Sequence, residues 1–265
     1  MHFQRSNLFR PFTDLIKGPI LEIGAGCGAI TRFLGEQGQK VFAVEGSARR
    51  ASIIGERCRD LSNVSIINAN FQDLKTTRKF QTITLIGVLE YARVYFQDGS
   101  AVDPIDRMLR QVADMLTEDG VLFVAIENQL GLKYLAGFPE DHLGIAMSGV
   151  EEHYTSDSVV TFGKSELSER LSNAGLHHAS FAYPFPDYKL PELVMSETAL
   201  SGPHAERYAA LVAGSLAADR QHPGRLNFRM SKAIGPLLRN GLGPDLAYSF
   251  LVMASKSDNA FQREA

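Results

Sequence analysis

The 265-residue chain lacks the features that would take it out of the ordinary globular class. It has only two cysteines, Cys27 and Cys58, so a disulfide framework is not expected. No apolar run reaches the roughly 18 residues that a membrane-spanning helix needs. Residues 1–7 lack the apolar core of a signal peptide. We therefore expect a cytoplasmic protein that is not embedded in a membrane.

An excess of basic charge is also missing. Lysine and arginine number 27 against 30 acids, which gives a formal net charge of −3. A nucleic-acid-binding domain usually shows a clear basic face, so no nucleic-acid partner is expected. No internal repeat or low-complexity tract is visible. The length suits one large domain with an insertion, or one and a half domains.

The most informative stretch is a buried strand at residues 20–23 that runs into a glycine-rich turn at residues 24–28 and then into a helix. A second apolar strand, residues 41–44, ends in Glu45, close to the spacing of about 20 residues seen in nucleotide-binding folds. The glycines let the backbone approach a ligand, and an acid at a strand tip can hydrogen-bond both ribose hydroxyls. A turn without a ligand does not require these glycines and acids, so we predict a nucleotide-binding site.

The turn fits two cofactor classes. Residues 24–29 satisfy the dinucleotide fingerprint G-x-G-x-x-G/A. Residues 22–28 also satisfy E-x-G-x-G-x-G, the pattern of S-adenosylmethionine (SAM) methyltransferases. Glu22 favours the second class, because a carboxylate there can meet the cationic ammonium of a methionyl group, whereas an anionic pyrophosphate gains nothing from it.

Strands and helices alternate from residue 19 onward, which predicts a parallel sheet covered on both faces. The expected strands are residues 19–24, 40–45, 63–68, 80–87, 120–127, 176–183 and 246–254. The expected helices are residues 27–37, 48–59, 103–117 and 165–174, with a turn at 118–120 and a helical stretch at 197–243. The expected units are an N-terminal segment (1–18), a cofactor-binding core (19–185), a helical insertion that caps the substrate (186–243) and a final core strand (244–256).

Two segments stand outside this alternation. Residues 1–16 are amphipathic, and they are interpreted either as a helix packed on the sheet or as a lid over the cofactor. Residues 128–160 form a loop too long for an ordinary connection. Since this loop contains several aromatic and apolar residues, we expect it to be ordered and functional.

With these motifs in place, the chain resembles a class I SAM-dependent methyltransferase. The resemblance implies an α/β, seven-stranded Rossmann-like fold, with the last strand antiparallel and a helical insertion before it. It implies SAM as cofactor, S-adenosylhomocysteine as product, and a set of cofactor-binding residues: Glu22, Gly24, Ala25, Gly26, Gly28, Glu45, Gly46, Asn70, Phe71, Gly87 and Val88. Two positions depart from the family pattern. Asn70 stands where an acid is usual, and residues 80–82 lack the usual aspartate.

Residues 125–134, 139–142 and 183–191 look like methyltransferases that accompany glycosyltransferases in bacterial surface-polysaccharide synthesis. This narrower resemblance implies methylation of a sugar hydroxyl on a glycan, with a glycosyltransferase as partner. Three rivals stay open: an O- or N-methyltransferase of a small metabolite, a non-catalytic SAM-fold partner of a glycosyltransferase, and a dehydrogenase. DNA methylation is disfavoured, since no Asn-Pro-Pro-aromatic sequence follows the fourth strand.

An alcohol acceptor has to lose a proton, so a general base near it would help. His142, flanked by two acids, is the first candidate, because a carboxylate can orient the ring and support its protonated form. His153, also beside acids, is the second. The alternative for each is a solvated loop histidine. Two further histidines, His204 and His222, could touch substrate from the helical insertion.

Glu90 and Glu127 are candidate substrate contacts because they lie at the carboxyl ends of strands, where the site is expected. Asp187 and Tyr188 are candidates because the prolines around them would present their polar groups rigidly to a sugar. The last two lie between prolines, so the alternative is a proline-rich connector. No metal site is expected. The acids at 140, 141, 151 and 152 match no fixed ligand motif, and a solvated acidic loop is the preferred interpretation.

Overall fold

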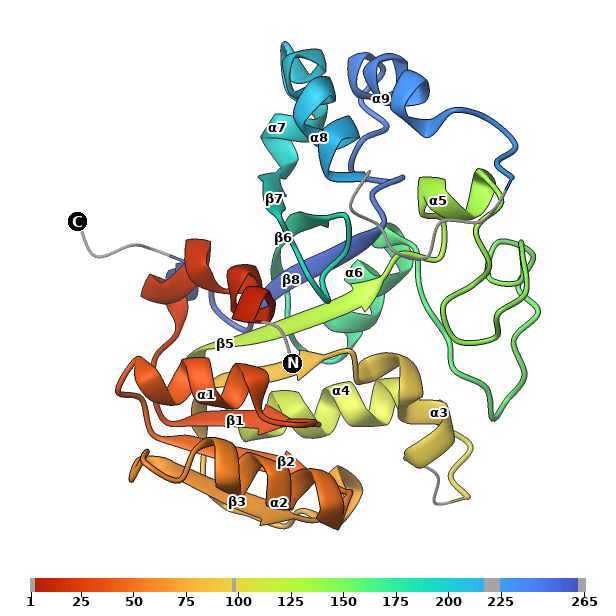
Figure 1. The fold of residues 1–265 in the computed structure, drawn as a ribbon. Helices are drawn as coiled ribbons and strands as arrows, with labels where there is room; N and C mark the ends of the chain where they lie inside the picture. The colour runs from red at the N-terminus through yellow and green to blue at the C-terminus, as the bar shows by residue number, and fades with distance from the viewer. Residues whose placement is uncertain (1–2, 97–98, 217–224, 262–265) are drawn as a thin grey trace.

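The computed structural model describes residues 3–96, 99–216 and 225–261, and within them it contains one mixed sheet of eight strands (Figure 1). The strand order is β3-β2-β1-β4-β5-β8-β6-β7. The parallel half consists of β1 (Ile20–Ile23), β2 (Val41–Glu45), β3 (Val64–Asn68), β4 (Phe80–Ile86) and β5 (Leu116–Glu127). The antiparallel pairings involve β8 (Ser249–Ser255), β6 (His178–Phe185) and β7 (Leu193–Ser196).

The expected count of seven strands is therefore one short. The missed strand is β7, which has four residues and pairs only with β6 at the sheet edge. Such a short edge strand has little of the apolar periodicity on which a sequence prediction depends. The antiparallel last strand, β8, lies between β5 and β6.

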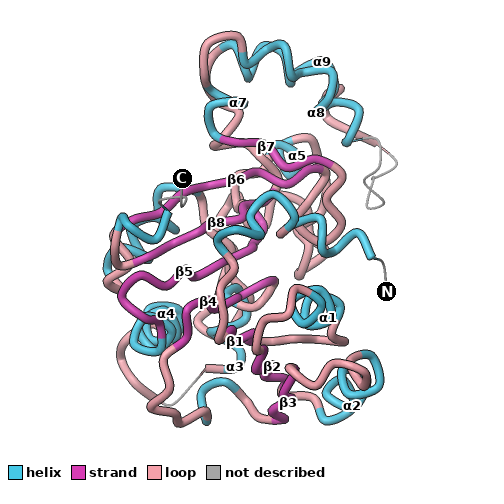
Figure 2. The backbone as a smooth tube through the Cα atoms, turned by 90° about the vertical axis from the view of Figure 1, so that its left-hand side faces the viewer, coloured by secondary structure: helices cyan, strands magenta, loops and turns pink. Residues whose placement is uncertain are grey.

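Helices cover both faces of the sheet. They are α1 (Ala29–Glu36), α2 (Ala48–Arg57), α3 (Ala92–Tyr95), α4 (Pro104–Met115), α5 (Leu132–Leu135), α6 (Lys164–Asn173), α7 (Glu197–Ser201), α8 (Ala209–Leu216) and α9 (Met230–Arg239). Figure 2 shows α4 on one side of the strands and α1 and α2 on the other, with α7, α8 and α9 gathered beyond β7. Short 3-10 helices occur at Phe3–Leu8, Arg10–Leu15, Phe71–Asp73, Leu89–Tyr91, Ala205–Tyr208 and Asp258–Phe261.

The join between α4 and β5 differs from the expected turn at residues 118–120. The helix ends at Met115, and the strand begins at once with Leu116, which pairs with Phe80 of β4. The register then shifts before Thr82, so the extra residues are absorbed as a bulge rather than as a separate turn.

The N-terminal segment forms two 3-10 helices that pack on the sheet. Leu8 and Phe9 are fully buried, and the ring of Phe9 lies 5.3 Å from that of Phe123 on β5. This matches the packed alternative for residues 1–16. Among the described residues, no helix combines the length and apolar character that a membrane span needs.

Candidate active site

The predicted cofactor residues meet at one edge of the sheet. Because β1 to β5 are parallel, their carboxyl ends point the same way, and ligand sites in such sheets lie outside this edge. The structure places the glycine turn, residues 24–28, after β1. Glu45 ends β2, Asn70 follows β3, and Gly87 follows β4.

The glycine turn needs its glycines for two reasons. Gly24, Gly26 and Gly28 have φ angles of +70°, +59° and +76°, a region that other residues rarely adopt. A Cβ on Gly24 would also stand 2.5 Å from a methyl carbon of Val88. The turn therefore brings the end of β1 into contact with the segment that follows β4.

Beside the glycine turn lies a small cavity of about 50 Å³, whose walls include Glu22, Ala25, Gly26 and Arg5. Glu22 is buried, and its Oε2 has no hydrogen-bond partner among the described residues. Burial raises the pKa of Glu22 to about 8. A buried carboxylate with an unused oxygen suits a cationic group such as an ammonium.

Glu45 braces the turn in the structure. Its Oε2 accepts the backbone N–H of Gly26 at 2.8 Å, and its Oε1 accepts the backbone N–H of Ser47 at 2.9 Å and Nε of Arg50 at 2.9 Å. Since Oε2 accepts only one hydrogen bond from the described residues, it keeps a lone-pair site for a further donor such as a ribose hydroxyl. The bracing role was not expected from the sequence.

The candidate adenine-side residues lie next to this strand end. A Cβ added to Gly46 would stand 2.9 Å from Oδ1 of Asn70, so the absence of a side chain at Gly46 admits the amide. Phe71 is largely buried, and its ring stacks on Phe96 with 6.0 Å between centroids.

A larger cleft of about 640 Å³ adjoins the small cavity, since Arg5 and Ile86 line both. Its other walls are Gly87, Glu90, Tyr91, Asp141, His142, Tyr188, Lys189 and Leu190. Arg5 belongs to the N-terminal segment and was not expected at the site. The packed N-terminal segment thus also supplies a wall of both cavities.

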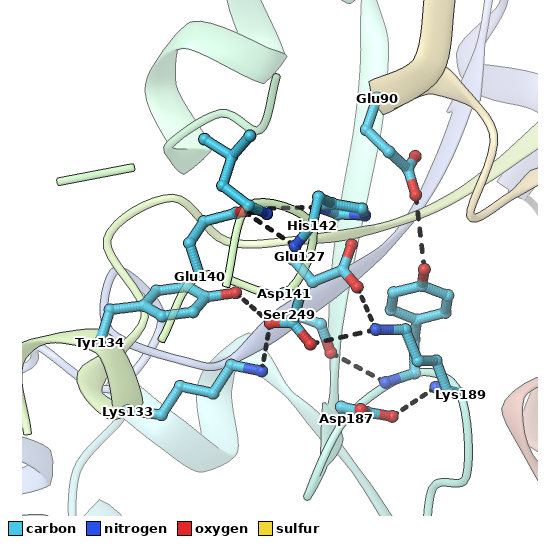
Figure 3. Close-up of polar contacts among 12 residues, drawn as sticks. Glu90, Glu127, Lys133, Tyr134, Glu140, Asp141, His142, Asp187, Lys189 and Ser249 are labelled. Carbon is cyan, nitrogen blue, oxygen red and sulfur yellow. Dashed lines mark hydrogen bonds and ion pairs between the residues drawn. The ribbon is translucent and has the colours of Figure 1, made fainter. Parts of the chain in front are cut away.

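Glu90, Glu127 and His142 converge at this cleft, and we call them the acid–histidine cluster (Figure 3). One ligand atom from each lies within 4.8 Å of the other two. Both glutamates are 0% exposed, and burial together with the Glu127 carboxylate raises the pKa of Glu90 to about 8. Nδ1 of His142 lies 2.9 Å from Oε1 of Glu140, so the second ring nitrogen, Nε2, remains for chemistry.

Burial alone would lower the pKa of His142, but the hydrogen bond to Glu140 and the nearby Glu127 and Glu90 carboxylates raise it overall. The ring of Tyr91 meets His142 edge-on at 5.4 Å between centroids. The predicted histidine is therefore held in a fixed orientation at the wall of the cleft, with acids on two sides.

A buried ion network supports the cluster (Figure 3). Asp141 lies 2.6 Å from Nζ of Lys133 and 3.1 Å from Nζ of Lys189, and it accepts the hydroxyl of Tyr134. Nζ of Lys189 also lies 2.5 Å from Oε1 of Glu127. Burial alone would raise the pKa of Asp141, yet the two lysines hold it well below its usual range.

This network corrects the expectation of a solvated acidic loop. Glu140 and Asp141 are buried, and only Glu151 and Glu152 of the four acids are exposed. Lys133 is 1% exposed, although an isolated loop lysine gives no sequence signal of burial. The segment at 139–142 folds inward because its acids find cations there.

The remaining candidates lie in different surroundings. His153 is 60% exposed beside Glu151 and lines neither cavity described above.

The loop after β6 holds two candidate substrate contacts. Oδ1 of Asp187 accepts hydrogen bonds from the backbone N–H groups of Lys189 and Leu190 and so stabilises a turn in this loop. Tyr188 is buried, and its hydroxyl lies 3.5 Å from Oε1 of Glu90. His204 is exposed, and His222 lies outside the described residues.

Comparison with known proteins bears on the cofactor half of the site. Residues 21–122 match a family model described as "Methyltransferase domain". The ribosomal RNA small subunit methyltransferase A of Streptococcus equi subsp. zooepidemicus is 39% identical over 62 residues, which is 23% of this chain and 21% of that protein. The chain thus matches about a fifth of the length of this curated relative.

Solved structures extend the likeness in fold. A SAM-dependent methyltransferase of Thermotoga maritima aligns with a TM-score of 0.52 at 15% identity, over 96% of this chain and 91% of that one. Phosphoethanolamine N-methyltransferase 2 of Haemonchus contortus, solved with S-adenosylhomocysteine, aligns with a TM-score of 0.53 at 11% identity, over 96% and 52%.

Residues 21–122 therefore match a methyltransferase domain, and the chain shares the Rossmann-like α/β fold of solved SAM-dependent methyltransferases.

Proposed function

We propose that the chain transfers the methyl group of SAM to a hydroxyl of a sugar in surface-polysaccharide synthesis. The observation that carries the proposal is the adjacency of the two cavities. The small cavity holds Glu22 beside the glycine turn, and the large cleft holds Glu90 and His142. A cofactor in the first cavity would present its methyl group toward the second, where an acceptor has room.

The proposed cofactor contacts follow the edge of the sheet. Glu22 would bind the methionyl ammonium, and the backbone of residues 24–28 would lie along the methionyl chain. Glu45 would reach the ribose, and Asn70 and Phe71 would flank the adenine. Gly87 and Val88 would close the site from the end of β4.

The reaction is an in-line displacement, in which alignment supplies much of the acceleration. The acceptor oxygen forms a bond to the methyl carbon as the carbon–sulfur bond breaks. The electron pair of that bond stays on sulfur, giving the neutral thioether of S-adenosylhomocysteine. The hydroxyl proton passes to the acid–histidine cluster. A hydroxyl needs such a group more than an amine does, which supports an oxygen acceptor.

The choice of a sugar rests on the sequence resemblance of residues 125–134, 139–142 and 183–191. The polar wall formed by Glu90, His142 and Lys189 suits a ligand with many hydroxyls. The glycosyltransferase partner and the cytoplasmic location belong to the same proposal and have the same basis.

The test is transfer of labelled methyl from SAM into fractions of the source cell separated by size. Label in large glycan is the expected result, whereas label only in small molecules would favour a metabolite enzyme. The variant Glu45→Ala should lose SAM binding and transfer together, because Gly26 and Ser47 lose their acceptor. Arg50→Ala is the control and should bind SAM within about threefold of wild type, since the exposed Arg50 contributes little while Gly26 and Ser47 keep their acceptor. Glycan synthesis unchanged by Glu45→Ala would favour the scaffold alternative.

A further inference from the structure

The acid–histidine cluster contains more buried carboxyl oxygens than its partners among the described residues satisfy. Oε2 of Glu90 and Oε2 of Glu127 are buried, and neither has a hydrogen-bond partner among the described residues. Buried polar groups are nearly always paired, and an unpaired buried carboxyl oxygen is unfavourable, so each such atom points to a missing partner. Both unpaired oxygens belong to residues whose side chains meet at one point.

The histidine of the cluster has the arrangement of a metal ligand. Nδ1 of His142 lies 2.9 Å from Oε1 of Glu140, while the backbone N–H groups of His142 and Leu143 donate to the other oxygen of Glu140. A carboxylate that accepts the Nδ1 proton fixes the tautomer and leaves the Nε2 lone pair free to coordinate. This pairing of carboxylate and histidine recurs behind metal-bound imidazoles.

The two carboxylates are also held from behind. The hydroxyl of Tyr188 lies 3.5 Å from Oε1 of Glu90, and Nζ of Lys189 lies 2.5 Å from Oε1 of Glu127. Oε1 of Glu90 accepts a hydrogen bond and Oε1 of Glu127 takes part in an ion pair, whereas Oε2 of each glutamate has no hydrogen-bond partner among the described residues. Outer contacts of this kind orient metal ligands.

We infer that Glu90, Glu127 and His142 bind one divalent cation of the transition-metal type, such as Mn²⁺ or Zn²⁺. Two carboxylates with one imidazole suit these ions, whereas Mg²⁺ prefers oxygen ligands throughout. Ligands at about 2.1 Å from one ion are at most about 4.2 Å apart, so atoms within 4.8 Å need only a small side-chain movement. An organic ammonium is the weaker alternative, because an imidazole nitrogen would be a poor partner for it beside two carboxylates.

The cation site has a consequence for the acceptor that rests on the proposed function. Three protein ligands leave coordination positions open toward the cleft of about 640 Å³. Two neighbouring oxygens of a sugar could occupy them, and the cation would lower the pKa of the bound hydroxyl. With the cation bound, the three side chains would serve as ligands, so the hydroxyl proton would leave to solvent in the cleft instead of to the cluster. The favoured substrate class is therefore a sugar with adjacent oxygens, one of which receives the methyl group.

The test begins with the full-length chain, stripped of metal with EDTA and titrated with Mn²⁺ alone while the free-ion EPR signal is followed. Zn²⁺ is tested by competition with a chromogenic chelator. One site per chain is expected. Glu127→Gln and His142→Ala should each weaken binding at least about tenfold. Glu151→Gln and His177→Ala, exposed residues of the same types, should leave it unchanged.

Circular dichroism and S-adenosylhomocysteine binding establish that each variant is folded. Absence of a site for either ion in the wild-type chain would overturn the inference, as would binding that survives both cluster variants. Methyl transfer is measured separately. Transfer to glycan that is insensitive to EDTA would refute the cation and leave the proposed function standing. A chain that binds the metal but methylates no hydroxyl would support the cation site and refute the proposed function.

Discussion

The hydroxyl of Tyr188 lies against Gly87, so closely that a Cβ added to the glycine would stand 2.7 Å from the oxygen. Gly87 also has a φ angle of +69°, which favours glycine. The bare backbone after β4 thus lets the loop after β6 reach Glu90, where the same hydroxyl lies 3.5 Å from the carboxylate.

The variant Gly87→Ala should therefore destabilise the fold by about 2 kcal/mol, through backbone strain and displacement of Tyr188. The double variant Gly87→Ala/Tyr188→Phe lacks the hydroxyl that the new Cβ would clash with, so it should recover part of the lost stability. A double-mutant cycle by urea unfolding should then give a coupling of about 1 kcal/mol. Strict additivity of the two changes would contradict the close contact.

A second prediction concerns the stability of the cofactor-free protein. The pKa of Glu22 is about 8 in the folded chain against an ordinary value of 4.5. Between these values the folded state keeps a proton that the unfolded state has released, so the group lowers stability progressively as pH rises through this window. Glu22→Gln should stabilise the protein by roughly 4 kcal/mol at pH 8 and hardly at pH 4.5.

Denaturant titrations at the two pH values measure this difference. The exposed Glu56 provides the control, and Glu56→Gln should change stability little at either pH. An equal effect of Glu22→Gln at both values would show that Glu22 does not titrate in this window.

A third prediction follows for the cofactor. If Glu22 binds the methionyl ammonium, it must be ionised to do so, and at pH 6 most of it is protonated. The affinity for S-adenosylhomocysteine should rise with pH, by up to about tenfold per unit, and level off near pH 8. Calorimetry of Glu22→Gln should give weak binding with a flatter pH profile. If the affinity of the variant for S-adenosylhomocysteine rose with pH as steeply as that of the wild type, a group other than Glu22 would bind the methionyl ammonium.

The buried Lys133 gives a fourth prediction. Lys133→Met leaves Asp141 with Lys189 as its only close cation in the described part of the chain, and Lys189 is shared with Glu127. Thermal or urea unfolding should show a loss of about 3 kcal/mol, because breaking a buried pair strands a charge. Lys133→Met/Asp141→Asn should recover part of the loss.

The matched control is Lys164→Met, which removes a more exposed ion pair to Glu197 and should cost about 1 kcal/mol or less. Equal losses of unfolding free energy in the two lysine variants would mean that the burial of Lys133 does not increase the effect of removing it.

The sheet was largely predictable because its signals are local. Buried strands such as 121–126 read as continuous apolar runs, and Asp103 and Pro104 mark the start of α4 at the expected place. The errors occurred where pairing with a distant strand, and not the local sequence, determines the secondary structure. β7 is a strand because β6 offers an open edge, and residues 116–120 extend β5 because β4 accepts a bulge.

The same division holds for the site. The glycine turn and Glu45 lie within one βαβ unit, so spacing alone indicates a cofactor loop. Glu90, Glu127 and His142 come from separate segments, and no spacing rule links them. The sequence placed each near the carboxyl edge, but their convergence and their burial depend on how the segment at 139–142 folds inward.

The packing of Phe9 on Phe123 has a consequence for the order in which the protein is assembled. The N-terminal segment is synthesised well before β5, the strand on which it packs. The surface that buries Phe9 therefore does not yet exist when the segment leaves the ribosome. Arg5 can reach the walls of both cavities only after the centre of the sheet exists. These residues are made before β5 but complete the walls of the cavities after it, so a chain in which the sheet has formed and this segment has not yet packed has an open pocket.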